Sequence, residues 1–270
     1  MTTARPAGEP EYYRTDGHYT GHAPAFYDVD QLPWAARVRA AWRAVRDEYE
    51  QNVGEGTDQV IDVFNPVGPK VPGWRSVNFQ TYLWRFHRAR RAFPVTVGLL
   101  ESIPGFTSGY INVLDPHSAI PAHEGDSNTI MRCHLGLDVP AGDCGVRVGS
   151  ETRTSANGTL LAFCDAQDHA SWNATDARRV VLVFDVMLPV YRERQRWICA
   201  NVLSATAVVW LETRLLTFTG ASGKPAVLPQ PLRTALRAAL GLALYLWLPI
   251  QRRRGEAPTV AADPVTATPY

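Results

Sequence analysis

Two β-strand patterns in the middle of the 270-residue chain constrain its fold more than any other feature. From Met131 to Val139 the residues alternate, so a strand would turn apolar side chains to one face. The other face would carry Arg132, His134, Gly136 and Asp138, and the alternation fits a solvated face and a polar interior equally well. The run Val180–Val183 is typical of a strand that is buried on both faces.

A turn signal lies between these two patterns. Asn157-Gly158 separates a polar run, Arg147–Ala156, from an apolar run, Thr159–Cys164. This dipeptide between two such runs indicates a β-hairpin. We therefore expect antiparallel strands on either side of Asn157-Gly158.

Two histidines lie in loop-like positions beside the strand patterns. His123 is followed two residues later by Gly125, and His169 follows Asp165. Imidazole binds Fe(II) well, and non-haem iron sites usually add a carboxylate two residues after the first histidine. Because Gly125 holds that position, the general two-histidine, one-carboxylate pattern is incomplete.

Four motifs from this region together indicate a family: PxHxGxxN, RxHLGLxxP, RVGxExR and HxxWN. With them, the segment Phe26–Pro189 resembles the aspartyl/asparaginyl β-hydroxylase family, which has peptide-hydroxylating and lipid A hydroxylase-like members. The resemblance implies a mainly β protein, a double-stranded β-helix (jelly roll) with flanking helices and a helical C-terminal extension. It also accounts for Gly125, because in this family x-Gly follows the first histidine and two histidines alone hold the metal.

The resemblance implies a role for each matching position. His123 and His169 would be the Fe(II) ligands. Arg132 and His134 match the pair at the 1-carboxylate of 2-oxoglutarate. Arg179 matches the arginine that pairs with the distal carboxylate, for which the planar guanidinium is suited.

The sequence departs from the peptide-hydroxylating members at three positions. Asn112 replaces a serine that helps to hold 2-oxoglutarate, and asparagine can still donate a hydrogen bond. Cys164 replaces an acidic residue, which leaves Asp165 as the retained acid. Tyr110 aligns with a lysine by which those relatives recognise an acidic side chain, so we expect Tyr110 to contact a different substrate.

Three functions stay open. The leading hypothesis is a dioxygenase that uses Fe(II), 2-oxoglutarate and O2 to hydroxylate an unactivated carbon of a small molecule, amino acid or peptide, with release of succinate and CO2. The second is the same reaction on an acyl chain of a membrane lipid. The third, of a different class, is a non-catalytic metal-binding jelly-roll protein.

Composition divides the chain into four parts. We expect a flexible arm at 1–25, the dioxygenase-like domain at 26–190, an apolar helical extension at 191–254 and a disordered tail at 255–270. Within the domain, Asp30–Val53 has the apolar spacing of a helix, and Asn65–Trp74 is predicted to be a loop near which substrate could enter.

The C-terminal extension contains two apolar runs, Val202–Leu216 and Ala235–Ile250, and Arg252–Arg254 follows the second. Either run is shorter than the roughly 20 residues of a bilayer span. Two interpretations fit: a helix that dips into an anionic membrane surface, or a helix docked on the barrel or at a dimer interface.

Charge and cysteine content limit which partners and which cellular compartment are expected. The net charge is +1 and no basic stripe with interleaved aromatic residues occurs, so a nucleic-acid partner is not expected. The four cysteines have no CxxC spacing, which predicts free thiols in a reducing compartment. The start MTTARPAGEPEYY has no apolar core of a secretory signal. A cytoplasmic bacterial protein is expected, and contact with the cytoplasmic face of a membrane is left open.

Overall fold

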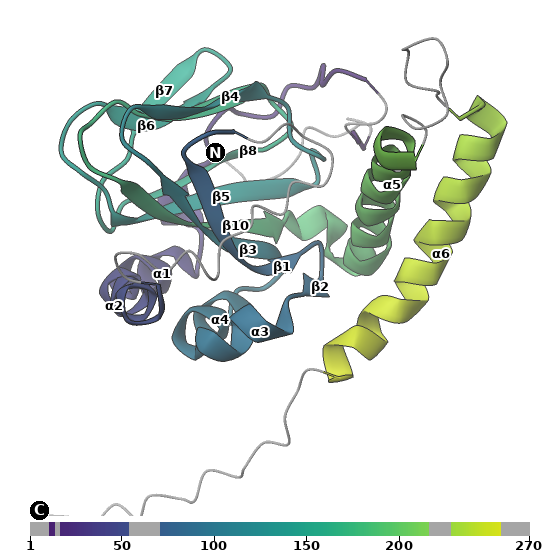
Figure 1. Ribbon diagram of the computed structural model, residues 1–270, viewed down its shortest axis with the longest axis horizontal. Helices are drawn as coiled ribbons and strands as arrows, with labels where there is room; N and C mark the ends of the chain where they lie inside the picture. The colour runs from purple at the N-terminus through teal and green to yellow at the C-terminus, as the bar shows by residue number, and fades with distance from the viewer. Residues whose placement is uncertain (1–10, 14–16, 54–70, 216–227, 255–270) are drawn as a thin grey trace, which may run out of the picture.

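Two antiparallel β-sheets face each other in the protein, and helices cover the outside of one of them (Figure 1). The structure, a computed structural model, describes residues 11–13, 17–53, 71–215 and 228–254. The predicted loop at Asn65–Trp74 lies mostly outside the described residues, as does the tail after residue 254.

The larger sheet has six strands in the order β2-β1-β3-β10-β5-β8. Their bounds are β2 Trp84–Arg85, β1 Trp74–Thr81, β3 Phe106–Leu114, β10 Arg179–Met187, β5 Ile130–Asp138 and β8 Leu160–Cys164. All neighbours are antiparallel. Every residue of β10 is buried, as the run Val180–Val183 predicts, because β10 lies between β3 and β5 and is covered on both faces.

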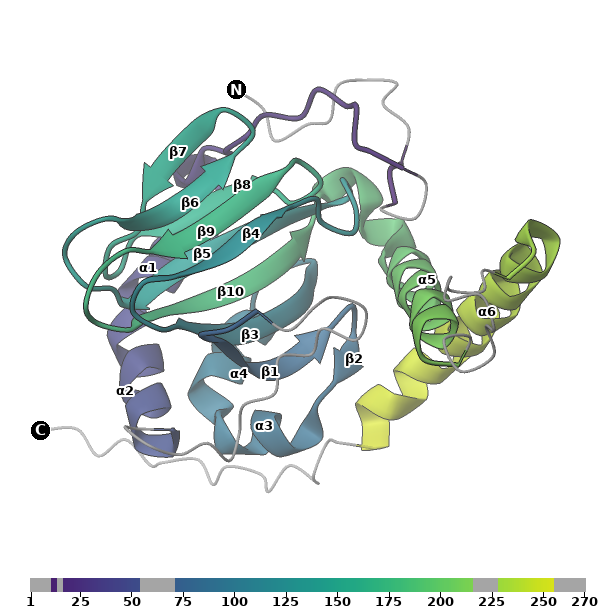
Figure 2. The same ribbon diagram turned by 45° about the horizontal axis from the view of Figure 1, so that its top comes forward.

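The smaller sheet has four strands in the order β4-β9-β6-β7. Their bounds are β4 Ser118–His123, β9 His169–Asn173, β6 Cys144–Val148 and β7 Glu151–Thr154. The two sheets form a sandwich, and Figure 2 shows the four-stranded sheet in front of the larger one. This arrangement confirms the predicted double-stranded β-helix with flanking and C-terminal helices.

The prediction of a hairpin at Asn157-Gly158 is wrong. The strands before and after it, β7 and β8, belong to different sheets, so the turn carries the chain from one sheet to the other. Gly158 adopts a positive φ of 73° and its amide donates to the Gly136 carbonyl, while the Asn157 side chain accepts from the Val139 amide. The local signal for a tight turn was correct, but the hairpin of this region is at Gly149, between β6 and β7.

Helices cover the outer face of the six-stranded sheet (Figure 2). The predicted helix Asp30–Val53 is a short 3-10 helix at Val29–Gln31 followed by α1 (Ala35–Ala40) and α2 (Trp42–Asn52). Two more helices follow, α3 (His87–Ala92) and α4 (Pro94–Glu101). The Glu48 carboxylate of α2 accepts from the amides of Val95 and Thr96, which fixes the first turn of α4.

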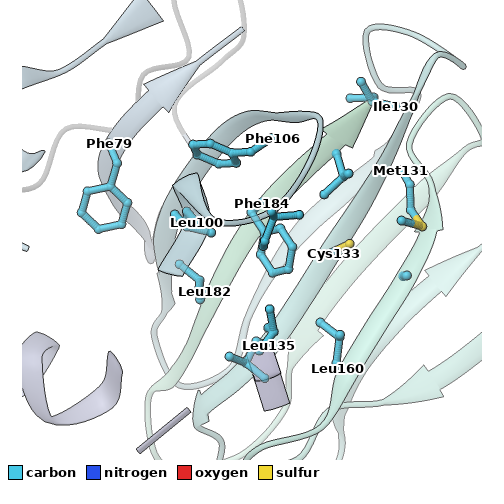
Figure 3. Packing of buried hydrophobic residues seen from close by; sticks show 14 of the residues in the cluster. Phe79, Leu100, Phe106, Ile130, Met131, Cys133, Leu135, Leu160, Leu182 and Phe184 are labelled. Carbon is cyan, nitrogen blue, oxygen red and sulfur yellow. The ribbon is translucent and has the colours of Figure 1, made fainter. Parts of the chain in front are cut away.

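The hydrophobic core lies between these helices and the outer face of the larger sheet (Figure 3). Cys133 and Leu135 of β5 and Phe184 of β10 pack there with Leu100 of α4. The alternation therefore turns Arg132 and His134 inward, towards the four-stranded sheet. All four cysteines are buried free thiols, as expected.

Two long helices, α5 (Gln195–Leu215) and α6 (Gln230–Arg254), pack against each other beside the sandwich (Figures 1 and 2). The Gln251 side chain of α6 donates to the carbonyl and accepts from the amide of Arg85 in the edge strand β2. This pairing blocks the exposed edge of the larger sheet. By length and composition, the part Gln230–Arg252 of α6 could cross a membrane.

Candidate active site

His123 and His169 lie side by side at the end of β4 and the start of β9, with ring centroids 4.3 Å apart. Each Nδ1 donates to a backbone carbonyl two residues earlier, that of Pro121 or Gln167, at 2.8 Å. Since a carbonyl only accepts, both Nδ1 atoms carry the proton and both Nε2 atoms keep a lone pair. Burial, assisted by His123 and Arg132, lowers the pKa of His169 to about 3, so its ring stays neutral. Two imidazoles that turn their Nε2 atoms away from these carbonyls suit a divalent transition metal.

The third group at this place is Asp165, a completely buried carboxylate. Its Oδ1 lies 3.7 Å from His169 Nε2 and 2.5 Å from Arg132 Nη1. Among the described residues, no group of three or more His, Cys, Asp and Glu side chains is placed to hold a metal. The residues present therefore fit a metal held by two histidines, with the remaining positions left to other ligands.

Arg132 is bound by two buried carboxylates that sequence patterns did not assign to it. Its Nε and Nη2 donate to Asp185 at 2.8 and 3.0 Å, and its Nη1 contacts Asp165. Burial alone would lower the pKa of Arg132, but these two carboxylates outweigh burial and raise it. Three of its five N–H groups point to the carboxylates, which leaves two for a ligand. Arg132 thus lies at the site, with its guanidinium held in a fixed orientation.

Arg179 is a buried cation, only 2% exposed, at the start of β10. Its Nη atoms donate to the hydroxyls of Ser171 and Ser155 at 2.8 and 2.9 Å, and its Nε has no hydrogen-bond partner. In the described part of the chain, no carboxylate makes an ion pair with it. Burial lowers its pKa to about 10. A buried guanidinium held by two hydroxyls is costly unless an anion pairs with it, so this position suits a carboxylate ligand.

The remaining predicted residues form a row on the inner face of the larger sheet. In the register, Val183 of β10 lies between Tyr110 and His134, and Val181 lies opposite Asn112. Asn112 Oδ1 and His134 Nδ1 are buried without a hydrogen-bond partner. Burial, with Arg179 and Arg132 nearby, lowers the pKa of His134 well below its usual value. Both groups remain available to a polar ligand between the sheets.

Tyr110 lies next to Arg132, whose guanidinium carbon is 5.9 Å from the centre of its ring. The structure thus brings all seven predicted site residues to the inner side of the sandwich. It separates Cys164 from them, because this side chain packs in the core on the opposite face of β8. The serines that hold Arg179 and the partner Asp185 of Arg132 were missed, since no local motif marks contacts that form only when distant strands pair.

A double-stranded β-helix with two neighbouring histidines and a buried arginine that can bind a carboxylate is typical of the 2-oxoglutarate-dependent dioxygenases. Residues 39–189 match the family model described as aspartyl/asparaginyl beta-hydroxylase. The chain belongs to this family of hydroxylases.

Two curated relatives differ in what their names describe. The chain is 30% identical over 175 residues to an ornithine lipid ester-linked acyl 2-hydroxylase of Rhizobium tropici, covering 62% of this chain and 62% of that protein. It is 32% identical over 207 residues to the human aspartyl/asparaginyl beta-hydroxylase, covering 67% of this chain and 27% of that protein. The chain therefore matches less than two thirds of the length of either relative.

Solved structures of the cupin type are similar to parts of the sandwich. A sugar phosphate isomerase of the cupin superfamily from Silicibacter pomeroyi has a TM-score of 0.32 at 15% identity, covering 48% of this chain and 70% of that one. For an oxalate decarboxylase predicted in Thermotoga maritima the TM-score is 0.30 at 10% identity, covering 43% and 81%.

Proposed function

We propose that the protein is an Fe(II)- and 2-oxoglutarate-dependent dioxygenase that hydroxylates an acyl chain of a membrane lipid. The observation that carries this proposal is the similarity to the ornithine lipid acyl 2-hydroxylase, which extends over a similar share of both chains. It favours the second sequence-based hypothesis over the leading one, a small molecule, amino acid or peptide.

His123 and His169 would hold the metal through their Nε2 atoms, because both Nδ1 atoms donate to backbone carbonyls. When bound, Fe(II) with 2-oxoglutarate would activate O2, so that one oxygen atom enters a C–H bond and the other converts the cosubstrate to succinate and CO2. The hydrogen bonds from Nδ1 keep both rings in the tautomer and orientation that ligation needs.

Arg179 would pair with the distal carboxylate of 2-oxoglutarate. Ser155 and Ser171 hold its guanidinium between the sheets, and no acid of the described chain competes for it. His134 and Asn112 would face the same cosubstrate with their unsatisfied polar atoms. The two N–H groups that Arg132 does not give to Asp165 and Asp185 would serve the 1-carboxylate.

Two further features support a lipid rather than an acidic protein side chain. Tyr110 provides an aromatic ring where a cation would be needed to bind a substrate carboxylate, and this ring already lies beside Arg132. A helix with an exposed apolar side, α6, packs next to the domain.

The test is turnover with defined substrates. Purified protein with Fe(II), 2-oxoglutarate and O2 is given detergent-dispersed ornithine lipid, a phospholipid, or a mixture of free amino acids and peptides. We expect succinate in proportion to a lipid whose acyl chain has gained one oxygen, and no product from His123→Ala. Hydroxylated amino acid or peptide in place of hydroxylated lipid would overturn the substrate assignment, and succinate from none of them would overturn the enzyme assignment.

A further inference from the structure

The polarity of α6 is the reverse of that of a helix on a soluble domain. Its solvent side carries Leu232, Ala239, Leu242, Leu246, Trp247 and Ile250, which we name the α6 face; Leu242 is 55% exposed and Leu246 61%. Spacings of three, four and seven residues place these side chains on one side of the helix. A contiguous exposed apolar stripe of this kind marks an interaction surface.

Three polar residues of α6 lie on the opposite side and contact the rest of the protein. Arg233 pairs with Glu212 of α5 at 3.3 Å, and Gln251 bonds with the backbone of Arg85 in β2. The guanidinium of Arg237 lies over the ring of Tyr13. These contacts fix the rotation of α6, so the α6 face cannot turn inward without breaking them.

The same contacts argue against a helix that crosses a bilayer. The window Gln230–Arg252 meets the length and hydropathy of a span, and only 17% of it is buried. However, if α6 crossed a bilayer, the charged pair Arg233–Glu212 would lie beside the hydrocarbon of the lipids. Charged side chains are costly there. At the other end of the helix Gln251 binds the edge of the sheet, so α6 runs beside α5 and reaches the sandwich at β2 (Figure 1). Both observations favour a helix in the plane of a membrane surface.

Positive charge gathers beside the C-terminal end of α6, on the side of the helix that faces the domain. A cavity of about 630 Å³ there is lined by Arg85, Arg192, Arg196 and Arg252, against two acids, Glu101 and Glu193. Leu248 and Pro249 of α6 line the same cavity, which makes it continuous with the helix. Arginines beside an apolar stripe are complementary to anionic lipid headgroups above acyl chains.

The helix α6 is connected to the candidate active site through the N-terminal segment. Tyr12 donates from its hydroxyl to Glu124, the residue after His123, while the neighbouring Tyr13 lies under Arg237 of α6. The segment thus spans from the loop of the first histidine to the inner side of α6.

We propose that the α6 face docks on an anionic lipid bilayer with the helix axis in the membrane plane, and that the arginine-lined cavity lies at the headgroups. The docking rests on the polarity of α6 and not on the identity of the substrate, so it is tested by binding without turnover.

The test compares the full-length protein with the variant Leu242→Ser/Leu246→Ser/Ile250→Ser in sedimentation with vesicles. Vesicles are made of phosphatidylglycerol and phosphatidylcholine in equal parts, or of phosphatidylcholine alone. We expect the wild type to bind the anionic vesicles, less strongly at high salt, and the variant to bind at least about tenfold more weakly. Val95→Ser, which removes an exposed valine from α4, should bind as the wild type does.

Two further variants and measurements keep the outcomes distinct. Arg252→Glu should weaken binding to anionic vesicles more than to neutral ones. Circular dichroism and turnover of a detergent-dispersed substrate should be the same for the triple variant and the wild type, which separates docking from catalysis. Absence of binding by the wild type, or equal binding by a folded triple variant, would overturn the proposal. So would a lipid-free dimer that the triple variant converts to a monomer, because the α6 face would then join two copies.

Discussion

The carboxylate of Asp165 occupies the space into which a side chain at Gly125 would project. The Gly125 amide donates to the Asp165 carbonyl at 2.8 Å, and the amide of Asp126 donates to Asp165 Oδ2 at 3.2 Å. The loop after His123 is thereby fitted to the loop before His169. The packing of Asp165 requires the glycine that stands in place of the carboxylate of the two-histidine, one-carboxylate pattern. An acid at position 125 would displace Asp165.

This contact predicts the effect of a methyl group at position 125. Gly125→Ala should lower the free energy of unfolding by roughly 1–3 kcal/mol, because the new Cβ overlaps a fully buried carboxylate. The control is Gly98→Ala in α4, where the space around the glycine is open. That change should be neutral or should stabilise by up to about 1 kcal/mol, since alanine is the better helix former. Urea unfolding measures both, and equal effects would contradict the packing argument.

The strands of the site could be predicted because their patterns are local. Alternation at Met131–Val139 and the apolar run Val180–Val183 each indicate a strand without reference to the rest of the chain. The alternation alone did not decide whether the polar face meets solvent or the interior. That depends on the pairing of Val183 with His134 and Tyr110 from two other strands, which places this row between the sheets.

Local sequence patterns could not predict contacts between distant segments of the chain. Arg132 pairs with Asp185, 53 positions away, and Arg179 is held by Ser155. The Asn157-Gly158 turn shows the same limit, because its dipeptide fixes a backbone conformation and does not choose the partner strand. Family motifs supplied what local patterns could not, namely which polar residues share a site.

Arg179 should be the residue on which affinity for 2-oxoglutarate depends most. Arg179→Lys keeps the charge but loses the planar pair of donors, and we expect 2-oxoglutarate to bind roughly 10–100-fold more weakly. Arg178→Lys is the matched control, because Arg178 is the adjacent arginine and pairs with Glu50. Anaerobic titration of the Fe(II) protein with 2-oxoglutarate, followed by its visible absorption, gives both affinities. Similar losses in the two variants would remove Arg179 from the cosubstrate site.

His169 should be essential for metal binding, whereas His117 should not. His169→Ala removes one of the two free Nε2 atoms, so Fe(II) affinity should fall by about 100-fold or more. His117→Ala changes an exposed ring that pairs with Asp176, and Fe(II) binding should be retained. Equilibrium dialysis against Fe(II), with a chelator to remove bound metal first, measures this. Tight metal binding by the wild type without any spectral response to 2-oxoglutarate would favour the non-catalytic metal-binding alternative.

Tyr110→Lys should impair the native reaction without creating activity on an acidic side chain. The new ammonium group would lie beside the Arg132 guanidinium, where two like charges repel and where Asp165 and Asp185 are already paired. Turnover should fall by roughly tenfold or more, at about 1.4 kcal/mol per factor of ten. The Tyr110→Phe variant, which keeps the ring, should retain most of the turnover. Unchanged turnover in Tyr110→Lys would show that Tyr110 does not contribute to the pocket.

Acid should destabilise the metal-free protein through its buried histidines. Burial lowers the pKa of His169 to about 3, whereas an unfolded histidine titrates near pH 6.5. Below about pH 6.5 the unfolded chain therefore binds more protons than the native one, and the free energy of unfolding falls as the pH falls. The contribution of His169 is fully present above pH 6.5 and is lost progressively down to about pH 3, with about 2 kcal/mol gone by pH 5.

Urea unfolding at pH 7 and pH 5 isolates this contribution. The loss of stability between the two values should be about 2 kcal/mol smaller in His169→Gln than in the wild type, because glutamine does not titrate. His134→Gln should change the loss in the same direction, since burial also lowers the pKa of His134. Bound metal should make the fall with acid steeper, because ligation keeps the imidazoles unprotonated in the native state while the unfolded chain still takes up protons. An identical pH dependence in the wild type and both variants would mean that neither buried ring resists protonation, and the neutral form of His169 would lose its electrostatic support.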